Sequence, residues 1–426
     1  MSSPREKTLL HLIRDYTEPI RDPIWKNIHI SPGFKKLISL PIFQKLGRIK
    51  QLGPAYLVYP GAVHTRLNHS LGVFHLARLL MISLLEREDS AHGLPGSLSV
   101  EGVKSFLTAA LLHDLGHFPF AHSLKELPLK SHETLGAEEI QSNPIAGVAG
   151  SELGCDPERV AAIIDEDRNA EGDEEVLYFR RLLSGVLDPD KLDYLNRDAY
   201  FCGVPYGVQD TEYVFQKIHP HYSRGIALDG EGITALENIL FSKYLMYRTV
   251  YWHRVVRTAT AMIKHPLTMA MSEGTLTPEE LYWLDDEQFF SRFPARKDSS
   301  YSLISRVTSR DLFKTALEKP FDPVRHGKLL SLEERLVKSE EAAARLSGVC
   351  SRTVQPWEVI VDIPEPISFE IELPLVERAE PQDLPDTVSV FSPPVVEGFT
   401  ASMRKIRIFA PADLISPLKK MEDTLI

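Results

Sequence analysis

Three histidines and one aspartate fall within a ten-residue stretch, at His113, Asp114, His117 and His122. The apolar run of residues 106–112 precedes them and predicts a buried helix that carries His113 and Asp114 at its C-terminal end. An imidazole and a carboxylate that converge on one ion suit Fe, Mn or Zn better than Ca or Mg. A histidine in a core helix is more often a structural residue, so the doublet alone leaves both interpretations open.

Two other segments contain residues of the same kinds. Asn68–Val73 (NHSLGV) lies before His113–His117 (HDLGH), and Asp190–Asp198 (DKLDYLNRD) lies after it. In this order the three segments resemble the HD-domain metal phosphohydrolases, and within them the branch of the deoxynucleoside triphosphate triphosphohydrolases. The resemblance extends over residues 20–265 and, more loosely, over residues 300–426.

The resemblance implies roles for individual residues. One divalent transition metal ion (Mn, Fe or Zn) would be bound, with additional Mg or Mn accompanying the nucleotide, and its ligands correspond to His69, His113, Asp114 and Asp190. The further active-site histidines, as acid, base or charge stabiliser, correspond to His117, His122 and His132. The substrate-binding residues correspond to Gln51 for the sugar 3′-hydroxyl, to Arg66, Lys191, Tyr194 and Asp198 for phosphates and sugar, and to Arg248 for the terminal phosphate.

The residue types are consistent with these roles. A planar guanidinium such as that of Arg66 can bind two phosphate oxygens at once. Lys191, Tyr194 and Asp198 recur at steps of three and four and therefore share one helical face. Ordinary structural roles are the alternative: Arg66 as a surface cation, and the helix after residue 188 as an amphipathic helix with a capping aspartate.

The chain departs from the family pattern at several positions. Phe118 stands where the family often has glycine, and Lys125 stands where it often has a carboxylate that orients the histidine matching His122. Ser39 and Gly47 replace the residues with which animal members bind a guanine activator, so the same GTP activation is not expected. The candidate regulatory residues, in a segment that faces a regulatory nucleotide in the family, are Arg310 and Lys314.

The composition is that of an ordinary globular chain, with 43% hydrophobic and 25% charged residues. A net charge of −11 argues against a broad nucleic-acid-binding surface, although it allows a local basic pocket. The three cysteines have no paired spacing, which favours a reducing compartment. The N-terminus lacks the apolar core of a signal peptide, and the apolar segment 71–85 is too short to span a bilayer. We therefore expect a cytoplasmic protein that binds neither membranes nor nucleic acids.

Periodicity and capping signals predict a mainly α protein with a small C-terminal α+β lobe. The resemblance implies that the core is an all-helical HD domain. Helices are expected over residues 9–16, 70–85, 190–200, 236–264, 309–317 and 331–346, and after residue 131. Strands are expected over 357–363, 367–373, 388–391 and 404–409, before a helix over 412–424. The predicted domains are an N-terminal arm and first helix (1–48), the HD phosphohydrolase core (49–275), a helical extension (276–345) and the lobe (346–426).

The function that best matches these features is metal-dependent hydrolysis of deoxynucleoside triphosphates to deoxynucleoside and triphosphate. The resemblance also implies a homo-oligomer, with a tetramer as the expected state. Two alternatives stay open: an HD phosphohydrolase of another nucleotide phosphate ester, and a non-catalytic nucleotide-sensing or nucleic-acid-binding protein that keeps the fold.

Overall fold

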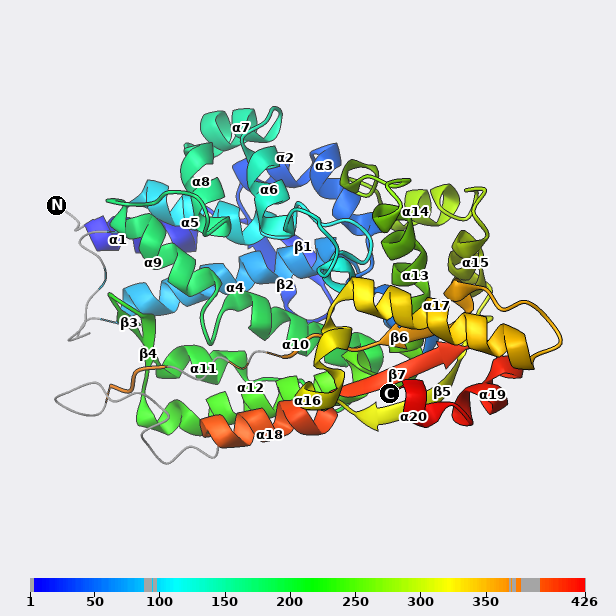
Figure 1. Ribbon diagram of the computed structural model, residues 1–426. Helices are drawn as coiled ribbons and strands as arrows, with labels where there is room; N and C mark the ends of the chain where they lie inside the picture. Colours follow the sequence, from blue (N-terminus) through cyan, green and yellow to red (C-terminus); the bar gives the residue numbers. More distant parts are fainter. Residues whose placement is uncertain are drawn as a thin grey trace.

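A computed structural model of the chain describes residues 4–87, 94, 98–367, 369, 373–376 and 391–425. Helices make up most of the described residues, and the three sheets have two, two and three strands (Figure 1). The prediction of a mainly α protein with an all-helical HD core is confirmed.

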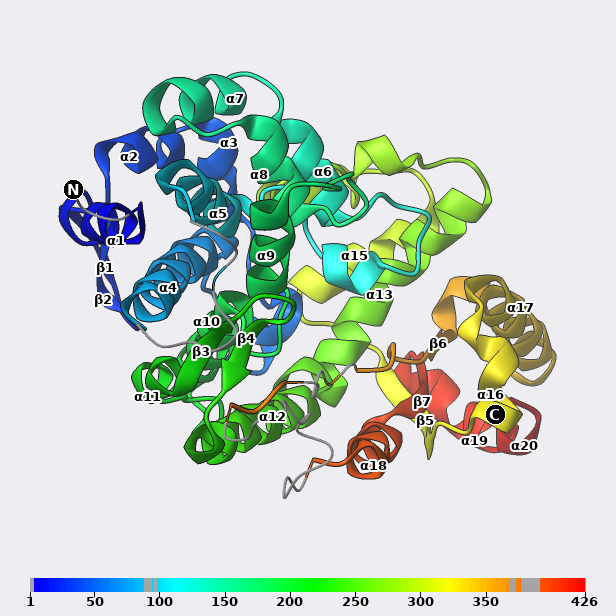
Figure 2. The same ribbon diagram turned by 90° about the vertical axis from the view of Figure 1, so that its left-hand side faces the viewer.

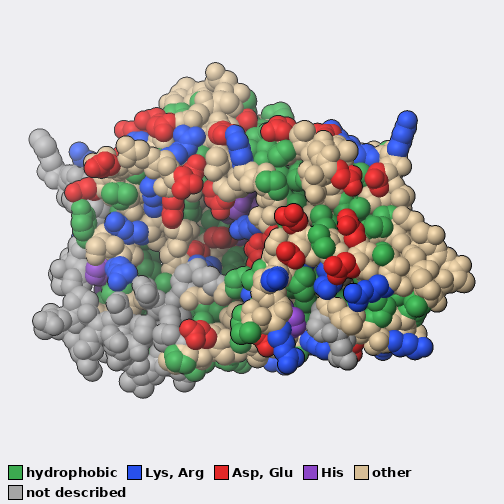
Figure 3. All heavy atoms as spheres, in the orientation of Figure 1, with side chains coloured by type: hydrophobic (Ala, Val, Ile, Leu, Met, Phe, Trp, Pro, Cys, Tyr) green, Lys and Arg blue, Asp and Glu red, His purple; other side chains and the backbone are tan. Residues whose placement is uncertain are grey.

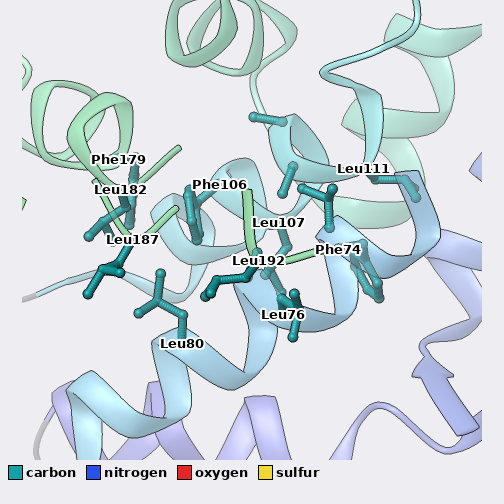
Figure 4. Packing of buried hydrophobic residues seen from close by; sticks show 14 of the residues in the cluster. Phe74, Leu76, Leu80, Phe106, Leu107, Leu111, Phe179, Leu182, Leu187 and Leu192 are labelled. Atoms are coloured by element: carbon teal, nitrogen blue, oxygen red, sulfur yellow. The ribbon is translucent and has the colours of Figure 1, made fainter. Parts of the chain in front are cut away.

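The centre of the molecule is built from α4 (Arg66–Glu86), α5 (Val100–Leu112) and α10 (Pro189–Cys202), which confirms the helices predicted over 70–85 and 190–200. Their leucine and phenylalanine side chains meet in one core with those of α9 (Glu174–Leu183) (Figure 4). The rings of Phe106 and Phe179 stack there with centroids 5.0 Å apart.

The apolar character of α4 comes from its central position. The prediction that the apolar segment 71–85 is too short to span a bilayer is wrong, because α4 is long and apolar enough to cross a membrane. However, 67% of an apolar 18-residue stretch of this helix is buried inside the protein. A helix that is apolar on all sides is expected in the core of a large domain. Its start is fixed by a reciprocal pair of hydrogen bonds between Thr65 and Asn68, which places the first turn at the site described below.

The N-terminal segment wraps around this core. It consists of α1 (Pro4–Arg14), the antiparallel ribbon β1 (Glu18–Asp22) and β2 (Lys26–Ile30), α2 (Pro32–Ile38) and α3 (Pro41–Gln44). In the ribbon Glu18 pairs with Ile30 and Asp22 with Lys26. The helix predicted over 9–16 begins and ends earlier than expected, as α1.

Further elements surround the central helices. They are α6 (His132–Ile140), α7 (Ile145–Val148), α8 (Pro157–Ile164), α11 (Thr211–Lys217), the hairpin β3 (Ile218–His221) and β4 (Gly225–Leu228), α12 (Ile233–Met246) and α13 (Arg254–Ser272). The single helix predicted over 236–264 is therefore wrong. A π-helical turn at Tyr247–Tyr251 ends α12, and the His253 side chain then accepts a hydrogen bond from the Val255 N–H to begin α13.

α13 lies between the central helices and a C-terminal sheet (Figure 2). The last part of the chain follows α13. Its elements are α14 (Asp286–Arg292), α15 (Ser302–Thr308), β5 (Lys314–Pro320), α16 (Pro323–His326), α17 (Leu332–Val349), β6 (Ile360–Asp362), α18 (Pro393–Met403), β7 (Lys405–Ala410), α19 (Ile415–Lys419) and α20 (Glu422–Leu425). The sheet is antiparallel in the order β5-β7-β6.

The helix predicted over 309–317 is wrong, because this segment contains the start of β5. Arg310 takes a left-handed backbone conformation (φ 61°) that ends α15, and the chain then pairs with β7. The C-terminal sheet consequently includes residues 314–320, which precede the predicted lobe boundary at 346. The predicted helix 331–346 and strand 404–409 are confirmed as α17 and β7. Most of the strand predicted over 388–391 and most of that over 367–373 lie outside the described residues. The final helix is divided into α19 and α20.

Candidate metal centre and active-site cavity

The three sequence segments converge at one point of the fold. His69 lies in the first turn of α4, His113 and Asp114 directly follow α5, and Asp190 lies in the first turn of α10. The Nε2 atom of His69 is 2.9 Å from Asp190 Oδ1, and that of His113 is 4.0 Å from the same oxygen. His113 Nε2 is also 3.5 Å from Asp114 Oδ1. The structure therefore brings together all four residues that correspond to the family's metal ligands.

This arrangement fits a divalent transition metal ion. His113 Nδ1 lies 2.9 Å from the carbonyl oxygen of Ala110, to which it donates its proton. Its Nε2 atom is buried and has no hydrogen-bond partner among the described residues, so its lone pair faces the site. Ligand atoms of His69, His113 and Asp114 lie within 4.8 Å of one another. Two imidazole nitrogens with carboxylate oxygens are a donor set that Fe, Mn or Zn accepts.

A buried carboxylate orients His69 from behind. The Nδ1 atom of His69 is 2.8 Å from Asp193 Oδ2. Asp193 also binds Arg197, whose Nε and Nη2 donate to the two carboxylate oxygens. Arg197 Nη1 donates to Asp22 at 2.9 Å, and the indole N–H of Trp25 donates to Asp193. A carboxylate that accepts the second N–H of a metal-binding histidine fixes its tautomer and orientation. Asp193 and Arg197 are three and seven residues after Asp190, a helical spacing that could have identified both.

The protonation of these groups follows from their contacts. Burial disfavours a charged His69, but its hydrogen bonds to Asp190 and Asp193 overcome this and raise its pKa to about 10. Burial likewise opposes ionisation of Asp190, whereas the contact with His69 lowers the pKa of Asp190 to about 2. The pKa of Asp114 also lies well below its usual range despite burial, because the Arg66 guanidinium lies 2.7 Å from this carboxylate. The site therefore holds ionised carboxylates, the ligands that a cation requires.

Three further histidines cluster beside this centre. Gly116 allows the loop after the doublet to lie against α6, because a Cβ atom there would be 2.1 Å from the carbonyl oxygen of His132. The rings of His117 and His132 have centroids 3.8 Å apart, and His117 Nε2 is 3.1 Å from His122 Nε2. Burial and the nearby cations lower the pKa of all three, to about 3 for His122, so the imidazoles are neutral.

A cavity of about 410 Å³ opens over both clusters. The space-filling view shows a recess near the middle of the molecule with acidic side chains inside it (Figure 3). The sequence-predicted residues that line the cavity are Gln51, Arg66, His69, His113, Asp114, His122, His132, Asp190, Tyr194 and Asp198. His117 is fully buried beneath the cavity wall.

The contacts of Asp198 add residues that the sequence did not indicate. Asp198 Oδ1 is 2.8 Å from His64 Nε2, and Asp198 Oδ2 accepts a hydrogen bond of 2.6 Å from the Tyr251 hydroxyl. Tyr251 lines the cavity beside Tyr194. Both carboxylate oxygens of Asp198 are thus engaged inside the protein, which fits a residue that positions Tyr251 at the cavity wall.

Several cations line the cavity without having been predicted. Lys50, Lys125, Arg257 and Lys264 are among its lining residues, the last two from α13. Lys50 and Lys125 lie close in sequence to the predicted site residues Gln51 and His122, whereas Arg257 and Lys264 reach the site only through the fold. The lining also contains the carboxylates of Asp114, Glu126, Asp190, Asp198 and Glu365, so the cavity presents side chains of both charges.

Two departures from the family pattern have visible consequences. Phe118 is buried and packs against Tyr282, with ring centroids 5.6 Å apart. Lys125 lines the cavity, and the next residue, Glu126, accepts hydrogen bonds from Lys264 and Arg335. Glu126 thus links α13 to α17, and among the hydrogen bonds of the described residues none joins this carboxylate to His122.

Four candidate residues lie apart from the cavity. Lys191 Nζ donates to Asp188 Oδ2 at 2.8 Å and to the Gly185 carbonyl oxygen at 2.7 Å, and Lys191 does not line the cavity. Arg248 lines a different cavity and donates to the Tyr244 hydroxyl. The other two are Arg310, whose Nη2 donates to the Leu57 carbonyl oxygen at 2.8 Å, and the exposed Lys314 at the start of β5.

The chain is similar to several known proteins. The family model of the HD domain matches residues 66–197, and the model of the HD-associated region matches residues 210–414. An uncharacterised protein of Methanocaldococcus jannaschii is 30% identical over 94% of this chain and 81% of its own length. The deoxynucleoside triphosphate triphosphohydrolase SAMHD1 of Homo sapiens is 26% identical over 84% of this chain and 65% of its own length.

Among solved structures, a hypothetical protein from Aquifex aeolicus superposes with a TM-score of 0.72 and 26% identity, over 95% of this chain and 99% of that one. A helical fold that brings histidines and aspartates together from the ends of three helices is typical of metal-dependent phosphohydrolases. The matched models and the relative from M. jannaschii place the protein within that class: the chain belongs to the HD-domain family.

Proposed function

We propose that this protein hydrolyses deoxynucleoside triphosphates to deoxynucleoside and triphosphate with the aid of a divalent metal ion. One observation carries the proposal: Gln51, Arg66, Tyr194 and Asp198 line the same cavity as the four candidate metal ligands. Similarity to SAMHD1 proteins, which are deoxynucleoside triphosphate triphosphohydrolases, supports the choice of substrate.

The candidate ligands His69, His113, Asp114 and Asp190 suit an ion that polarises a phosphoryl oxygen and lowers the pKa of a water molecule. The Arg66 side chain is fixed by Asp114, because its Nη1 donates to Asp114 Oδ2 at 2.7 Å. Its buried Nε has no partner among the described residues, which suits a guanidinium that binds phosphate. A guanidinium fixed in this way can stabilise charge on the phosphoryl oxygens without reorganisation.

The histidine cluster provides for proton transfer. His122 and His132 line the cavity, whereas His117 lies behind them, so the first two are the candidates for contact with substrate. The 3.1 Å separation of His117 Nε2 and His122 Nε2 allows one proton to be shared between these atoms. A bound polyphosphate would raise the pKa of the cavity histidines, because a nearby anion favours their charged form. Protonation of the leaving 5′-oxygen then becomes available only in the complex.

Product analysis tests the proposal directly. The purified protein is incubated with each deoxynucleoside triphosphate in the presence of Mn²⁺, Fe²⁺ or Mg²⁺, and the products are separated by ion-exchange chromatography. We expect deoxynucleoside and triphosphate in equal amounts, with activity lost in His113→Ala and retained in the control His29→Ala, whose histidine lies on β2 away from the cavity. Release of pyrophosphate or inorganic phosphate instead would identify a different phosphate-ester hydrolase.

The expected assembly belongs to the same proposal. We expect a homo-oligomer, a tetramer, in which exposed aromatic residues such as Tyr200 and Phe241 (58% and 46% exposed) are available for contacts between subunits. Light scattering with and without a deoxynucleotide mixture measures this, and a monomer under both conditions would refute it. We also expect a cytoplasmic location, and the free Cys155, Cys202 and Cys350 are consistent with one.

A nucleotide other than GTP is the proposed regulator, acting through Arg310 and Lys314. The hydrogen bond from Arg310 to Leu57 links the turn between α15 and β5 to the short helix at Gly53–Leu57, part of which lines the cavity. Replacement of both residues by alanine should reduce the response of activity to added deoxynucleotides. An unchanged response would leave the pair with a purely structural role.

A further inference from the structure

A second cavity, of about 310 Å³, lies at the junction of the core and the C-terminal sheet. It is lined by Arg248 and Trp252 from the segment between α12 and α13, and by Ser402, Met403, Lys405 and Arg407 at the end of α18 and in β7. Figure 2 shows α18 beside both α12 and the sheet. The two cavities share one wall, because Trp252 lines both of them.

The lining of this cavity is strongly positive. The described residues that line it include three cationic side chains, Arg248, Lys405 and Arg407, and no carboxylate. Glu318 on β5 accepts hydrogen bonds from Lys405 Nζ at 2.5 Å and from Arg407 Nε at 2.8 Å, so one carboxylate serves two cations. Asp362, opposite Arg407 on β6, is already bound by Arg257. The charge of the cavity is therefore only partly balanced by the neighbouring acidic residues.

Arg407 has an unused donor inside the protein. Its side chain is 5% exposed, and its Nη1 atom is buried without a hydrogen-bond partner among the described residues. A buried donor that lacks a partner is costly, and a guanidinium that loses one is more so. Phosphate oxygens are the preferred partners of such a group, because two of them match the fork of guanidinium N–H donors.

We propose that this cavity is an accessory site for the di- or triphosphate group of an anionic ligand, separate from the catalytic cavity. Its volume corresponds to about ten water molecules, at roughly 30 Å³ each, which exceeds the space that one phosphate needs. Arg407 and Lys405 bind the phosphates from the sheet, and Arg248 closes the site from the core. Free inorganic polyphosphate and a nucleotide share this chemistry.

Isothermal titration with inorganic triphosphate tests the site. The full-length protein is titrated in the presence of a chelator, so that no metal supports binding in the catalytic cavity. The variant is Lys405→Gln, and the matched control is Lys420→Gln, an exposed lysine outside both cavities. We expect Lys405→Gln to weaken binding by roughly tenfold, as for the loss of one charged phosphate contact. The control should change the affinity less than twofold, and added salt should weaken binding to the wild-type protein.

A parallel titration distinguishes the ligand sources. A deoxynucleoside triphosphate that binds more tightly than inorganic triphosphate, with the difference lost in Lys405→Gln, would identify a nucleotide site. Equal affinities would identify a polyphosphate site. Binding of inorganic triphosphate that is unchanged in both Lys405→Gln and Arg407→Lys would overturn the proposal and leave the cations as structural ion pairs. Circular dichroism on each variant verifies folding.

This test is independent of the catalytic proposal. Lys405 does not line the catalytic cavity, so Lys405→Gln should retain the wild-type rate of deoxynucleotide hydrolysis at saturating substrate, within twofold. If the protein hydrolyses no deoxynucleotide at all, the titration with inorganic triphosphate still decides whether the accessory site exists.

Discussion

Replacing Asp193 by asparagine tests how the protein controls its metal centre. Asp193 is fully buried and accepts from His69, Arg197 and Trp25, although it does not line the cavity. Asparagine keeps the shape and one acceptor oxygen but removes the negative charge. His69 would then lack the carboxylate that fixes its orientation, while all four candidate metal ligands remain in place.

The expected losses can be estimated from these contacts. Removing the carboxylate behind a metal-binding histidine reduces metal affinity about 10- to 100-fold, or roughly 1.4–2.8 kcal/mol. Breaking a buried ion pair costs about 3–5 kcal/mol in unfolding free energy. Arg197 keeps its second carboxylate partner, Asp22, at 2.9 Å, so we expect a value near the lower end, about 3 kcal/mol.

The matched control is Asp22→Asn, because Asp22 binds the same Arg197 but not His69. Both variants should be destabilised in urea unfolding of the metal-free protein. Only Asp193→Asn should lose metal affinity in competition with a chelator of known affinity. Wild-type metal affinity in Asp193→Asn, or an equal loss in both variants, would refute the role assigned to the carboxylate.

Three further predictions follow from single residues. Gln51→Ala should reduce the preference for 2′-deoxy over 2′,3′-dideoxy substrates, and equal rates on both in the wild-type protein would exclude a 3′-hydroxyl contact. Burial lowers the pKa of His265 to about 4, so the unfolded chain gains a proton below pH 6.5 that the folded chain gains only near pH 4. The free energy of unfolding should therefore fall as the pH drops through this window. By pH 5 the wild-type protein should have lost about 2 kcal/mol more than His265→Gln, measured by urea unfolding. Gly116→Ala should destabilise the protein by roughly 1–3 kcal/mol, because the new Cβ atom would meet the His132 carbonyl oxygen. The control is Gly150→Ala, whose Cβ atom would meet open space and should not destabilise the protein. Equal melting temperatures for the two variants would contradict this prediction.

Much of the candidate site could be predicted because its residues lie at helix ends within short motifs. The apolar run before His113 predicted a buried helix, and a buried helix carries the residues that follow it to a fixed place in the core. The cavity residues Tyr251 and Arg257 could not be predicted in this way. They reach the site only because the helix is interrupted between α12 and α13, and hydrophobic periodicity does not show this interruption.

Lys191 illustrates a different limit of sequence reasoning. Spacing placed Lys191, Tyr194 and Asp198 on one helical face, and Tyr194 and Asp198 do line the cavity. Periodicity fixes the direction of a Cβ atom, but the position of a lysine amine also depends on four further bonds. Here Asp188 caps α10 by accepting from the Lys191 backbone N–H at 2.6 Å, and its other oxygen accepts from the Lys191 amine. A capping aspartate three residues before a lysine thus competes for the amine that a phosphate would otherwise bind, and only a structure shows which contact forms.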